Sequence, residues 1–380
     1  MARAPAAPQA VRLILWHFRH VKDPRVARTR RHPLSNVLVM GLCAAVCGAD
    51  GFKAMAAFAR SRAGFFRRFV SMPHGTPSAD TFRRVFGALS PEAFEKAFRA
   101  WVGALAQGVA GQVVALDGKA VRGALQAAAR PLHLVHAWAC EQRLVLAQKA
   151  VKGAPGEVEA VAELIGALQL EGAVVTVDAN GCTRQVAQAC VDAKAHYVLA
   201  LKGNRGPLHR FVQSLFVVHA WQQGLPSAKG GTAPKVEQAH GRYEVRQVWA
   251  LPVRHWPTHW PGLRTAVLVR RQRQVPGQQV QVTWHTYVSS LPAHASKLAR
   301  AIRKHWDVEN GLHWVLDVGF GEDRRRVRHA TAAQNLARLH RLALTLLQRE
   351  TTARMGIALK RQQAGWDTSY LLRVLGVGLP

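Results

Sequence analysis

The sequence predicts an α/β protein, with a mixed sheet, a β-rich insertion and an all-helical domain ahead of the sheet. Two observations carry this prediction. Residues 11–108 show apolar side chains at helical spacing and contain no convincing strand. From residue 112 onward, short β-branched runs alternate with helical segments, which is typical of strands buried between helices.

Capping residues mark two helix starts within the N-terminal helical domain. Ser78 precedes ADTFRRVFGAL, and Ser90, followed by proline, opens PEAFEKAFRAWVGAL. Two capped helices joined by a short turn, with Arg83 and Arg84 on the first, predict a helix-turn-helix-like contact with DNA. The alternative is a helical domain that only packs on the rest of the protein. Residues 1–10 are rich in Ala and Pro, and we expect a disordered tail there.

Residues 109–234 are expected to form the first part of a catalytic core. Three strand-like runs, VVALDGKAVRG, LHLVHAWAC and RLVLAQKAV, resemble an antiparallel meander. A helix at 157–170, the strand AVVTVDA, a second helix and the strand HYVLALKGN follow. This element order is that of a ribonuclease-H-like core, in which the first and fourth strands lie side by side.

The rest of the chain divides into an insertion and a C-terminal helical part. After a helix at 207–223 and a Gly/Ser/Pro-rich break, residues 235–291 contain strand-like runs that we expect to form the β-rich insertion. Residues 292–380 contain one helical stretch, ARAIRKHWDVENGLHWVLDVGF at 299–320, and then amphipathic helices that cover the sheet.

The charge balance indicates a polyanionic partner. Lys and Arg number 52 against 22 Asp and Glu, a formal net charge of +30, and the excess is spread along the chain. DNA is the expected partner, because neutralised phosphates release counterions. Five scattered cysteines without a CxxC pair predict a reducing compartment. No apolar run is long enough to span a bilayer. We therefore expect a cytoplasmic protein, without membrane association, that joins the nucleoid when bound to DNA.

Three acidic residues are the candidate catalytic groups. Apolar runs end on Asp117 and on Asp178, and an acid at the end of a buried strand tends to mark a site. Glu309 lies in the helical stretch at 299–320, on the same face as His305 and His313. Such carboxylates suit a pair of Mg²⁺ ions, which prefer hard oxygen ligands. We predict that these three acids bind Mg²⁺, with Mn²⁺ as a possible substitute, for phosphodiester chemistry.

Plainer interpretations exist for each acid. The sequences Asp-Gly and Asp-Ala-Asn-Gly that begin at the two aspartates are often only turns. Asp317, Glu322 and Asp323 compete with Glu309 as the third acid. We favour Glu309 for its helical His/Trp/Asn setting, and we expect Glu322 and Asp323 to pair with Arg324–Arg326.

Other site classes are weaker. His305, Glu309 and His313 could form a zinc triad on one helix, but the sequence lacks HExxH. A serine hydrolase is not indicated, because no GxSxG appears. Neither GxxxxGK[ST] nor GxGxxG is present, so no nucleotide cofactor is expected.

Candidate DNA contacts flank the acids. Each lies in one of three places: at a strand end, at the start of the insertion, or near the third acid. In these places a polar side chain can hold a phosphate of the DNA backbone. Each could also be an ordinary surface residue, and the two histidines near Glu309 could instead orient its carboxylate. The predicted contacts are Lys119, Arg122, Lys202, Asn204, His240, Arg242, His305, Asn310, His313, Arg324 and Arg328.

Six segments together resemble a known family. LDGKAVRG, TVDANGC, YVLALKGN, HGRYEVR, HWDVENGLHWVLDVGFGED and AAQNLARLHRLAL are similar to the H-repeat-associated transposases of the insertion-sequence As-one type, a DDE group. The resemblance extends upstream through residues 22–49 and 76–86. It implies a ribonuclease-H-like catalytic domain, two-magnesium chemistry, and catalytic acids at Asp117, Asp178 and Glu309.

The chain departs from related DDE patterns at several positions. Related groups carry a Tyr/Arg/Glu/Lys signature whose Glu is the third acid. In this chain Ile302 stands at the Tyr position, His305 at the Arg position and Leu316 at the Lys position. The resemblance therefore assigns the missing basic contact to Arg324–Arg328. A family-like Lys-Ser-Asn-Glu run is altered within residues 152–157, although its final glutamate is kept.

The expected function is that of a DDE insertion-sequence transposase. Such an enzyme would bind the terminal inverted repeats of its element, cut a strand and join the freed 3′-hydroxyl to target DNA. Because two element ends must be coordinated, we expect a homodimer on DNA. Two alternatives remain: a metal-dependent nuclease or resolvase that does not join strands, and a domesticated DNA-binding protein without catalysis.

Overall fold

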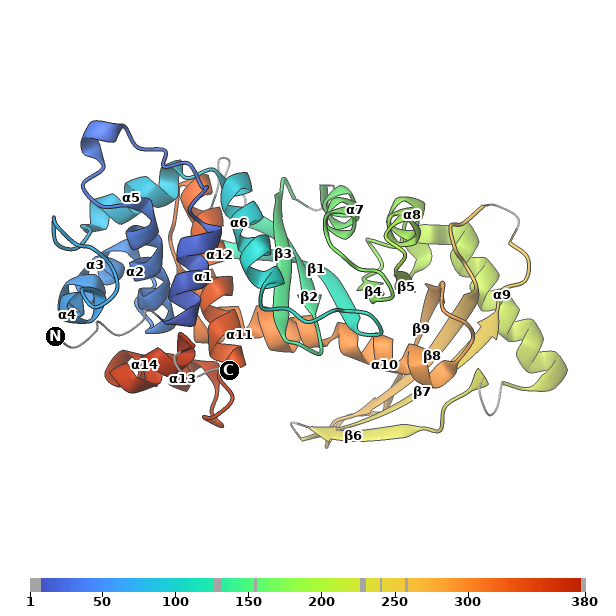
Figure 1. Ribbon diagram of the computed structural model, residues 1–380. Coiled ribbons are helices and arrows are strands. Elements are labelled where there is room, and N and C mark those ends of the chain that lie inside the picture. Colours follow the sequence, from blue (N-terminus) through green and yellow to red (C-terminus); the bar gives the residue numbers. More distant parts are fainter. Residues whose placement is uncertain are drawn as a thin grey trace.

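The computed structural model describes residues 8–125, 131–153, 156–225, 230–239, 241–256 and 259–376. A group of helices forms one end of the molecule (Figure 1). A large sheet begins at the centre of the molecule, and the strands nearest one edge of that sheet form the other end. Among the described helices, none combines the length and the apolar character that crossing a membrane requires.

The N-terminal part is helical, as predicted. Its helices are α1 (Gln9–His17), α2 (Leu34–Val46), α3 (Phe52–Ser61), α4 (Ala63–Phe66), α5 (Ala79–Ala88) and α6 (Pro91–Gly103). The Ser78 hydroxyl accepts a hydrogen bond from Thr81 N, and that of Ser90 accepts one from Ala93 N, both at 3.2 Å, so both predicted N-caps are confirmed. Helix α1 begins inside the segment that we expected to be disordered, and residues 1–7 of that segment lie outside the described residues.

Five strands and two helices form the core in the predicted order. The strands are β1 (Val113–Leu125), β2 (Pro131–Ala139), β3 (Leu144–Val151), β4 (Val174–Val177) and β5 (His196–Leu201), with α7 (Glu157–Ala167) and α8 (Arg184–Asp192) between them. Strands β1, β2 and β3 pair as an antiparallel meander, and β4 pairs in parallel with both β1 and β5. The first and fourth strands are therefore neighbours, which confirms the ribonuclease-H-like arrangement.

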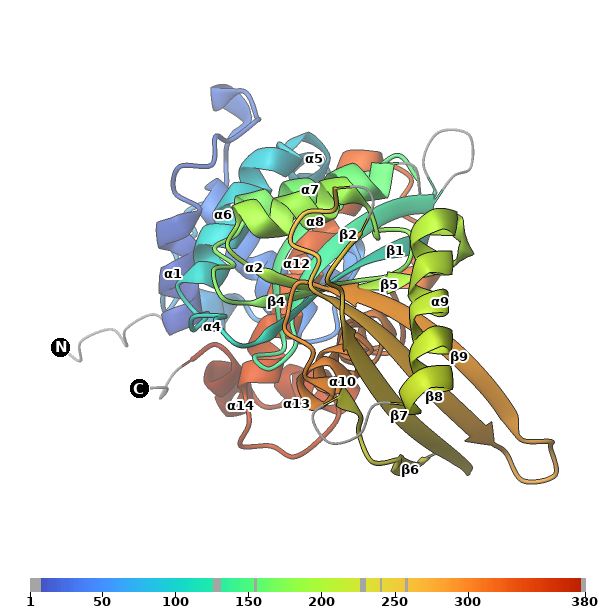
Figure 2. The same ribbon diagram turned by 90° about the vertical axis from the view of Figure 1, so that its right-hand side faces the viewer.

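The β-rich insertion continues the core sheet. It contains β6 (Lys235–Ala239), β7 (Arg242–Pro252), β8 (Thr265–Gln274) and β9 (Gln281–Ser289). Strand β9 pairs antiparallel with β5, which gives one nine-stranded sheet in the order β3-β2-β1-β4-β5-β9-β8-β7-β6. These strands extend beyond the core, with α9 (Gly206–Gln223) beside them (Figure 2). The boundary near residue 235 therefore separates two stretches of sequence within one continuous sheet.

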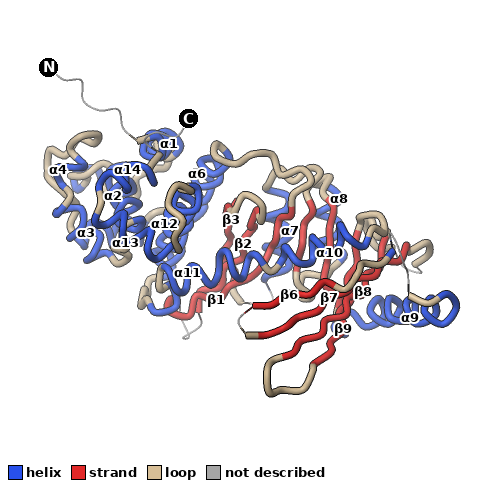
Figure 3. The backbone as a smooth tube through the Cα atoms, turned by 90° about the horizontal axis from the view of Figure 1, so that it is seen from below, coloured by secondary structure: helices blue, strands red, loops and turns tan. Residues whose placement is uncertain are grey.

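The C-terminal helices connect the sheet to the N-terminal domain. Helix α10 (Ala295–His305) and α11 (Trp314–Gly319) run across the face of the sheet opposite α7 and α8 (Figures 1 and 3). Helix α12 (Ala330–Arg349) packs against α2, α5 and α6 as well as β3, and α13 (Ile357–Trp366) and α14 (Thr368–Val374) lie beside it. A core of apolar side chains extends from α1 to α14 through the sheet.

The stretch at 299–320 is not one regular helix, contrary to our prediction. Helix α10 ends at His305, and a π-helical turn at Glu309–His313 precedes α11. The Trp314 amide bonds to the Glu309 carbonyl, five residues back. Two neighbours fix this turn at Gly311: the Gln348 amide donates to its carbonyl at 3.1 Å, and a Cβ added there would lie only 3.1 Å from the Trp138 ring.

Candidate metal centre

The two aspartates lie where the parallel pairing of β1 and β4 ends. Leu116 and Val177 form the last pair between these strands, and Asp117 and Asp178 are the residues that directly follow them in the sequence. Strand β1 does not end at Asp117, as we had expected; it continues to Leu125 and remains paired with β2. Only its pairing with β4 ends there, so β1 has no strand partner on that side from Asp117 onward in the described part of the chain.

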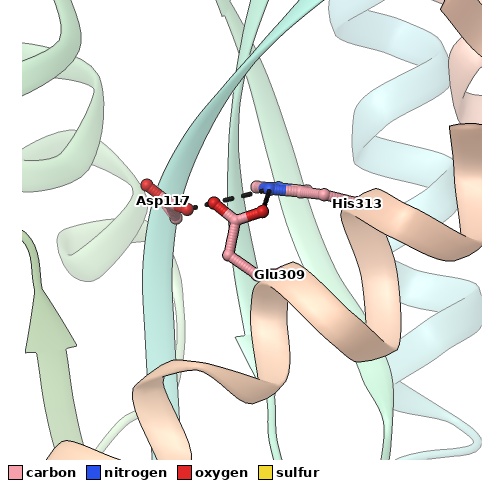
Figure 4. A group of neighbouring side chains, drawn as sticks. All are labelled: Asp117, Glu309 and His313. Atoms are coloured by element: carbon pink, nitrogen blue, oxygen red, sulfur yellow. Dashed lines mark ion pairs between the residues drawn. The ribbon is translucent and has the colours of Figure 1, made fainter. Parts of the chain in front are cut away.

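Glu309 and His313 approach Asp117 from the π-helical turn (Figure 4). Ligand atoms of these three residues lie within 4.8 Å of one another, close enough to share one metal ion. The His313 Nδ1 atom is 3.5 Å from a Glu309 oxygen and 3.7 Å from an Asp117 oxygen. The Asp117 side chain is 16% exposed, whereas that of Glu309 is 53% exposed, so this group, which we call the acid cluster, opens to solvent on the Glu309 side.

Negative charge is poorly balanced at Asp117. Burial, reinforced by the nearby charges of Glu309 and Asp178, raises the pKa of the Asp117 carboxyl to about 8. The hydrogen bond with His313 instead lowers the pKa of Glu309. A cation between the two carboxylates would remove the repulsion that favours protonation of Asp117.

The position of His313 fits one of the two roles expected for it. It is buried and faces both acids, as an orienting partner of the carboxylate would, and this burial argues against the DNA contact that we also predicted. Its ring lies 5.4 Å from that of His136, whose Nε2 accepts hydrogen bonds from the fully buried Arg341 at 3.2 and 3.3 Å. Burial and the Arg341 charge hold the pKa of His136 well below its usual value. The available signal was the spacing of four residues from Glu309, which fits an orienting partner as well as a phosphate contact.

Asp178 lies outside the acid cluster, although it follows the strand that neighbours Asp117. One of its carboxylate oxygens accepts hydrogen bonds from the backbone of Asn180 and Gly181, at 3.0 and 3.2 Å, so the alternative reading as a turn residue also holds. Its charge reaches Asp117, whose pKa it helps to raise. Its role as a metal ligand stays a prediction.

The competing third acids have other partners. Asp317 and Asp323 face Lys119, and Glu322 is buried in an ion pair with Arg341. The expected pairing of Glu322 and Asp323 with Arg324–Arg326 was therefore wrong, because these acids pair with basic residues from other segments of the chain.

The alternative zinc triad does not form. His305 shares a hydrogen bond with Thr176 at 3.0 Å, and this bond ties the end of α10 to β4. His305 is therefore not part of the acid cluster.

The prediction that Lys119 contacts a phosphate was wrong, because its ammonium is bound by carboxylates of the protein. Its ammonium lies 2.7 Å from both carboxylate oxygens of Asp317 and 3.9 Å from Asp323, and its side chain is only 7% exposed. A buried lysine held by two carboxylates is a structural ion pair, which connects β1 to α11 beside the acid cluster.

The other predicted DNA contacts are spread over a larger surface. A cleft of about 980 Å³ contains Asp117, Asp178 and Glu309 and is also lined by Lys202 and His305. The Asn204 amide donates to the Ala179 carbonyl at 3.1 Å, so it supports the loop after Asp178. Arg122, Asn310, Arg324 and Arg328 are exposed, Arg242 lies at the start of β7, and His240 is outside the described residues.

Gly118, next to Asp117, is packed closely against two side chains. A Cβ added there would lie 2.6 Å from His133 Nε2 and would also run into the Glu157 carboxylate. We expect Gly118→Ala to destabilise the protein by about 1–3 kcal/mol, because His133 and Glu157 must move. Urea denaturation measures this loss. Gly166→Ala is the control, since nothing lies near the added methyl in α7; equal stability of both variants would contradict the close packing.

Comparisons with known proteins identify the family of this chain. The family model described as "Transposase DDE domain" matches residues 110–346, and the one described as "DDE_Tnp_1-associated" matches residues 15–102. The chain belongs to the DDE transposase family. The two matched regions correspond to the sheet with its covering helices and to the N-terminal helices, respectively.

Relatives of this transposase span nearly its whole length. "Putative transposase YncI" of Escherichia coli O157:H7 is 32% identical over 96% of this chain and 95% of its own. "H repeat-associated putative transposase YhhI" of Escherichia coli K12 is 29% identical over 96% of this chain and 98% of its own. A piggyBac transposase in a synaptic complex with hairpin DNA has a TM-score of 0.45 and 10% identity, over 97% of this chain and 78% of that one. The predicted family is thus confirmed, and this chain is an insertion-sequence transposase of the DDE class.

Proposed function

We propose that this transposase cuts and joins DNA strands at the acid cluster, with Mg²⁺ or Mn²⁺ held by Asp117 and Glu309 and completed by Asp178. The observation that carries the proposal is the approach of Glu309 and His313 to Asp117 from a segment far along the chain. Hard carboxylate oxygens fit such a cation, and the raised pKa of Asp117 indicates a site short of positive charge.

Divalent cations, when bound, supply Lewis-acid stabilisation of the charge that develops on a phosphodiester. The protein's own residues prepare the site. His313 holds the Glu309 carboxylate by a hydrogen bond, and burial of Asp117 within β1 fixes the second carboxylate. Hydrolysis by water would break a P–O3′ bond and leave a 3′-hydroxyl and a 5′-phosphate. In the joining step that 3′-hydroxyl would attack a target phosphate, form a new P–O3′ bond and displace the target strand's own 3′-oxygen as a hydroxyl.

The cleft beside the acid cluster provides the DNA contacts in this proposal. Lys202 lies on its wall, and Arg271 and Arg303 of the insertion and of α10 line it as well. Arg271 pairs with Glu244 at 2.7 Å and Arg303 with Glu237 at 3.3 Å, so these arginines are held in place before DNA enters. We further propose that two copies of the chain assemble on DNA, because two element ends must be cut together.

A strand-transfer assay tests this function. We expect protein incubated with duplex carrying the element's terminal repeats, target DNA and Mg²⁺ to give joined products, and EDTA to remove both cleavage and joining. Cleaved strands without joined product would favour a nuclease or resolvase. Binding without any cleavage, in Mg²⁺ and in Mn²⁺, would favour a DNA-binding protein that has lost catalysis.

A further inference from the structure

A second hollow lies away from the acid cluster, between α5 and the segment that precedes α12. Its volume is about 830 Å³. We call it the arginine groove, after its basic lining: Arg83, Arg84, Arg325, Arg326, Arg328 and His329. Helix α5 belongs to the N-terminal region and the segment 325–329 to the DDE region, so the groove lies where the two matched regions meet.

The two walls of the groove lie close together at one end, near Gly87 and His329. A Cβ added to Gly87 of α5 would lie 3.7 Å from the His329 ring, which is ordinary van der Waals contact. The His329 side chain also caps α12 by accepting a hydrogen bond from Ala332 N at 3.4 Å. The groove therefore has a fixed shape, set by packed helices.

The acidic residue that lines the groove is already neutralised. The Asp50 carboxylate pairs with Arg325 at 2.6 Å and also with Arg361, which is buried. Both arginines are thus used within the protein, and Asp50 offers no free negative charge to repel an anion.

The remaining arginines are free to bind an anion. Arg84, Arg326 and Arg328 are exposed and make no ion pair within the described ranges. Arg83 pairs with Asp80 at 2.7 Å, but both side chains are 64% exposed, and such surface pairs contribute little. Planar guanidinium groups bind phosphate oxygens in a bidentate manner, so this lining fits phosphodiesters.

The arginine groove lies within reach of a duplex at the acid cluster. The Asp323 carboxylate accepts a hydrogen bond from the Arg122 amide at 3.0 Å, so the segment leading into the groove runs beside that part of β1. A Cβ added to Gly123 would lie 2.8 Å from the Arg325 backbone nitrogen, so Gly123 marks where β1 meets this segment. Asp117 and Gly123 are both in β1, and roughly 3.3 Å of strand per residue puts roughly 20 Å between them. This distance corresponds to about six base pairs at a rise of about 3.4 Å.

We propose that the arginine groove binds the phosphodiester backbone of the DNA duplex whose bond is cut at the acid cluster, about six base pairs from that bond. This inference rests on the proposed function. It assigns Arg83 and Arg84 of α5 to phosphates, in place of the base edges that a helix-turn-helix would read. It also gives the N-terminal domain a role in holding the duplex across the two regions.

The salt dependence of DNA binding tests the proposal. The triple variant Arg84→Gln/Arg326→Gln/Arg328→Gln removes the three unpaired groove charges. The control Arg60→Gln/Arg67→Gln/Arg68→Gln removes three exposed arginines from α3 and the segment after α4. Fluorescence anisotropy with a labelled element-end duplex of roughly 30 base pairs, about three turns, gives Kd over a range of KCl concentrations.

We expect the groove variant to lose about two to three units of slope in log K against log [KCl], and on the order of 100-fold in affinity at 0.1 M salt. The control should lose less than about one unit. Equal losses in both variants would overturn the groove, since only net charge would matter. Loss confined to an RNA duplex would overturn DNA as the ligand. Wild-type protein that binds no DNA would instead refute the proposed function itself.

Discussion

Changing Asp117 to asparagine is expected to lower the rate of DNA strand cleavage by roughly 1,000-fold or more, while DNA affinity stays within about twofold. Asparagine keeps the shape of the side chain but loses the charge that would hold a cation against Glu309. Cleavage of a labelled element-end duplex and its Kd, both measured in Mg²⁺, separate the two effects. Asp192→Asn is the matched control, because Asp192 is exposed on α8 and accepts a hydrogen bond from the Gln188 side chain, far from any acid of the cluster.

The same variant should make the metal-free protein more stable at high pH. The folded pKa of Asp117, about 8, exceeds its usual value of 3.8, so the folded state keeps a proton that the unfolded state has lost between these values. Stability therefore falls as pH rises through this window, and asparagine removes that loss. We expect a gain of roughly 5 kcal/mol at pH 8 and roughly 1–2 kcal/mol at pH 5, from about 1.4 kcal/mol per pKa unit. Unchanged stability of the variant at both pH values would contradict a raised pKa of Asp117 in the folded protein.

Replacing Arg341 by leucine should cause the largest loss of stability, about 3–5 kcal/mol. Arg341 is fully buried, pairs with Glu322 and donates to the Ala337 carbonyl at 3.0 Å. The variant leaves the Glu322 carboxylate buried without its counter-charge. Urea denaturation measures the loss, provided that the folded baseline is retained.

A second substitution distinguishes the missing charge from the missing volume. Arg341→Leu combined with Glu322→Leu removes both charges, and we expect it to recover most of the lost stability, because a buried pair can be replaced by apolar groups at little cost. A double variant as unstable as the single one would show that packing around Arg341, and not the Glu322 charge, dominates. The single variant should also disturb His136, which lies between Arg341 and His313.

Much of the fold followed from local patterns. The apolar runs that end at Asp117 and Asp178 predicted neighbouring strands, and the structure pairs them up to the residues just before these acids. Side-chain caps at Ser78 and Ser90 were equally readable, because a cap depends on residues only three positions away. The insertion was found as strands, but its union with the core sheet depends on pairing between β5 and β9, which no local pattern encodes.

The parts of the site that could not be predicted depend on distant partners. Lys119 looked like a phosphate contact because it follows Asp117, yet Asp317 binds it from nearly 200 positions away. His313 was placed on the correct helix face, but its burial against His136 required β2. The π-helical turn at Glu309 likewise depends on contacts of Gly311 with Trp138 and Gln348. Spacing shows which residues share a face, but not what covers that face.

The most direct test of the central claim is the position of a bound cation. Crystals grown with Mn²⁺ would locate it by anomalous scattering. We expect a peak about 2 Å from carboxylate oxygens of both Asp117 and Glu309, with Asp178 or His313 as a further ligand. A protein that cuts DNA with Mn²⁺ but shows its peaks only elsewhere would contradict the assignment of catalysis to these acids.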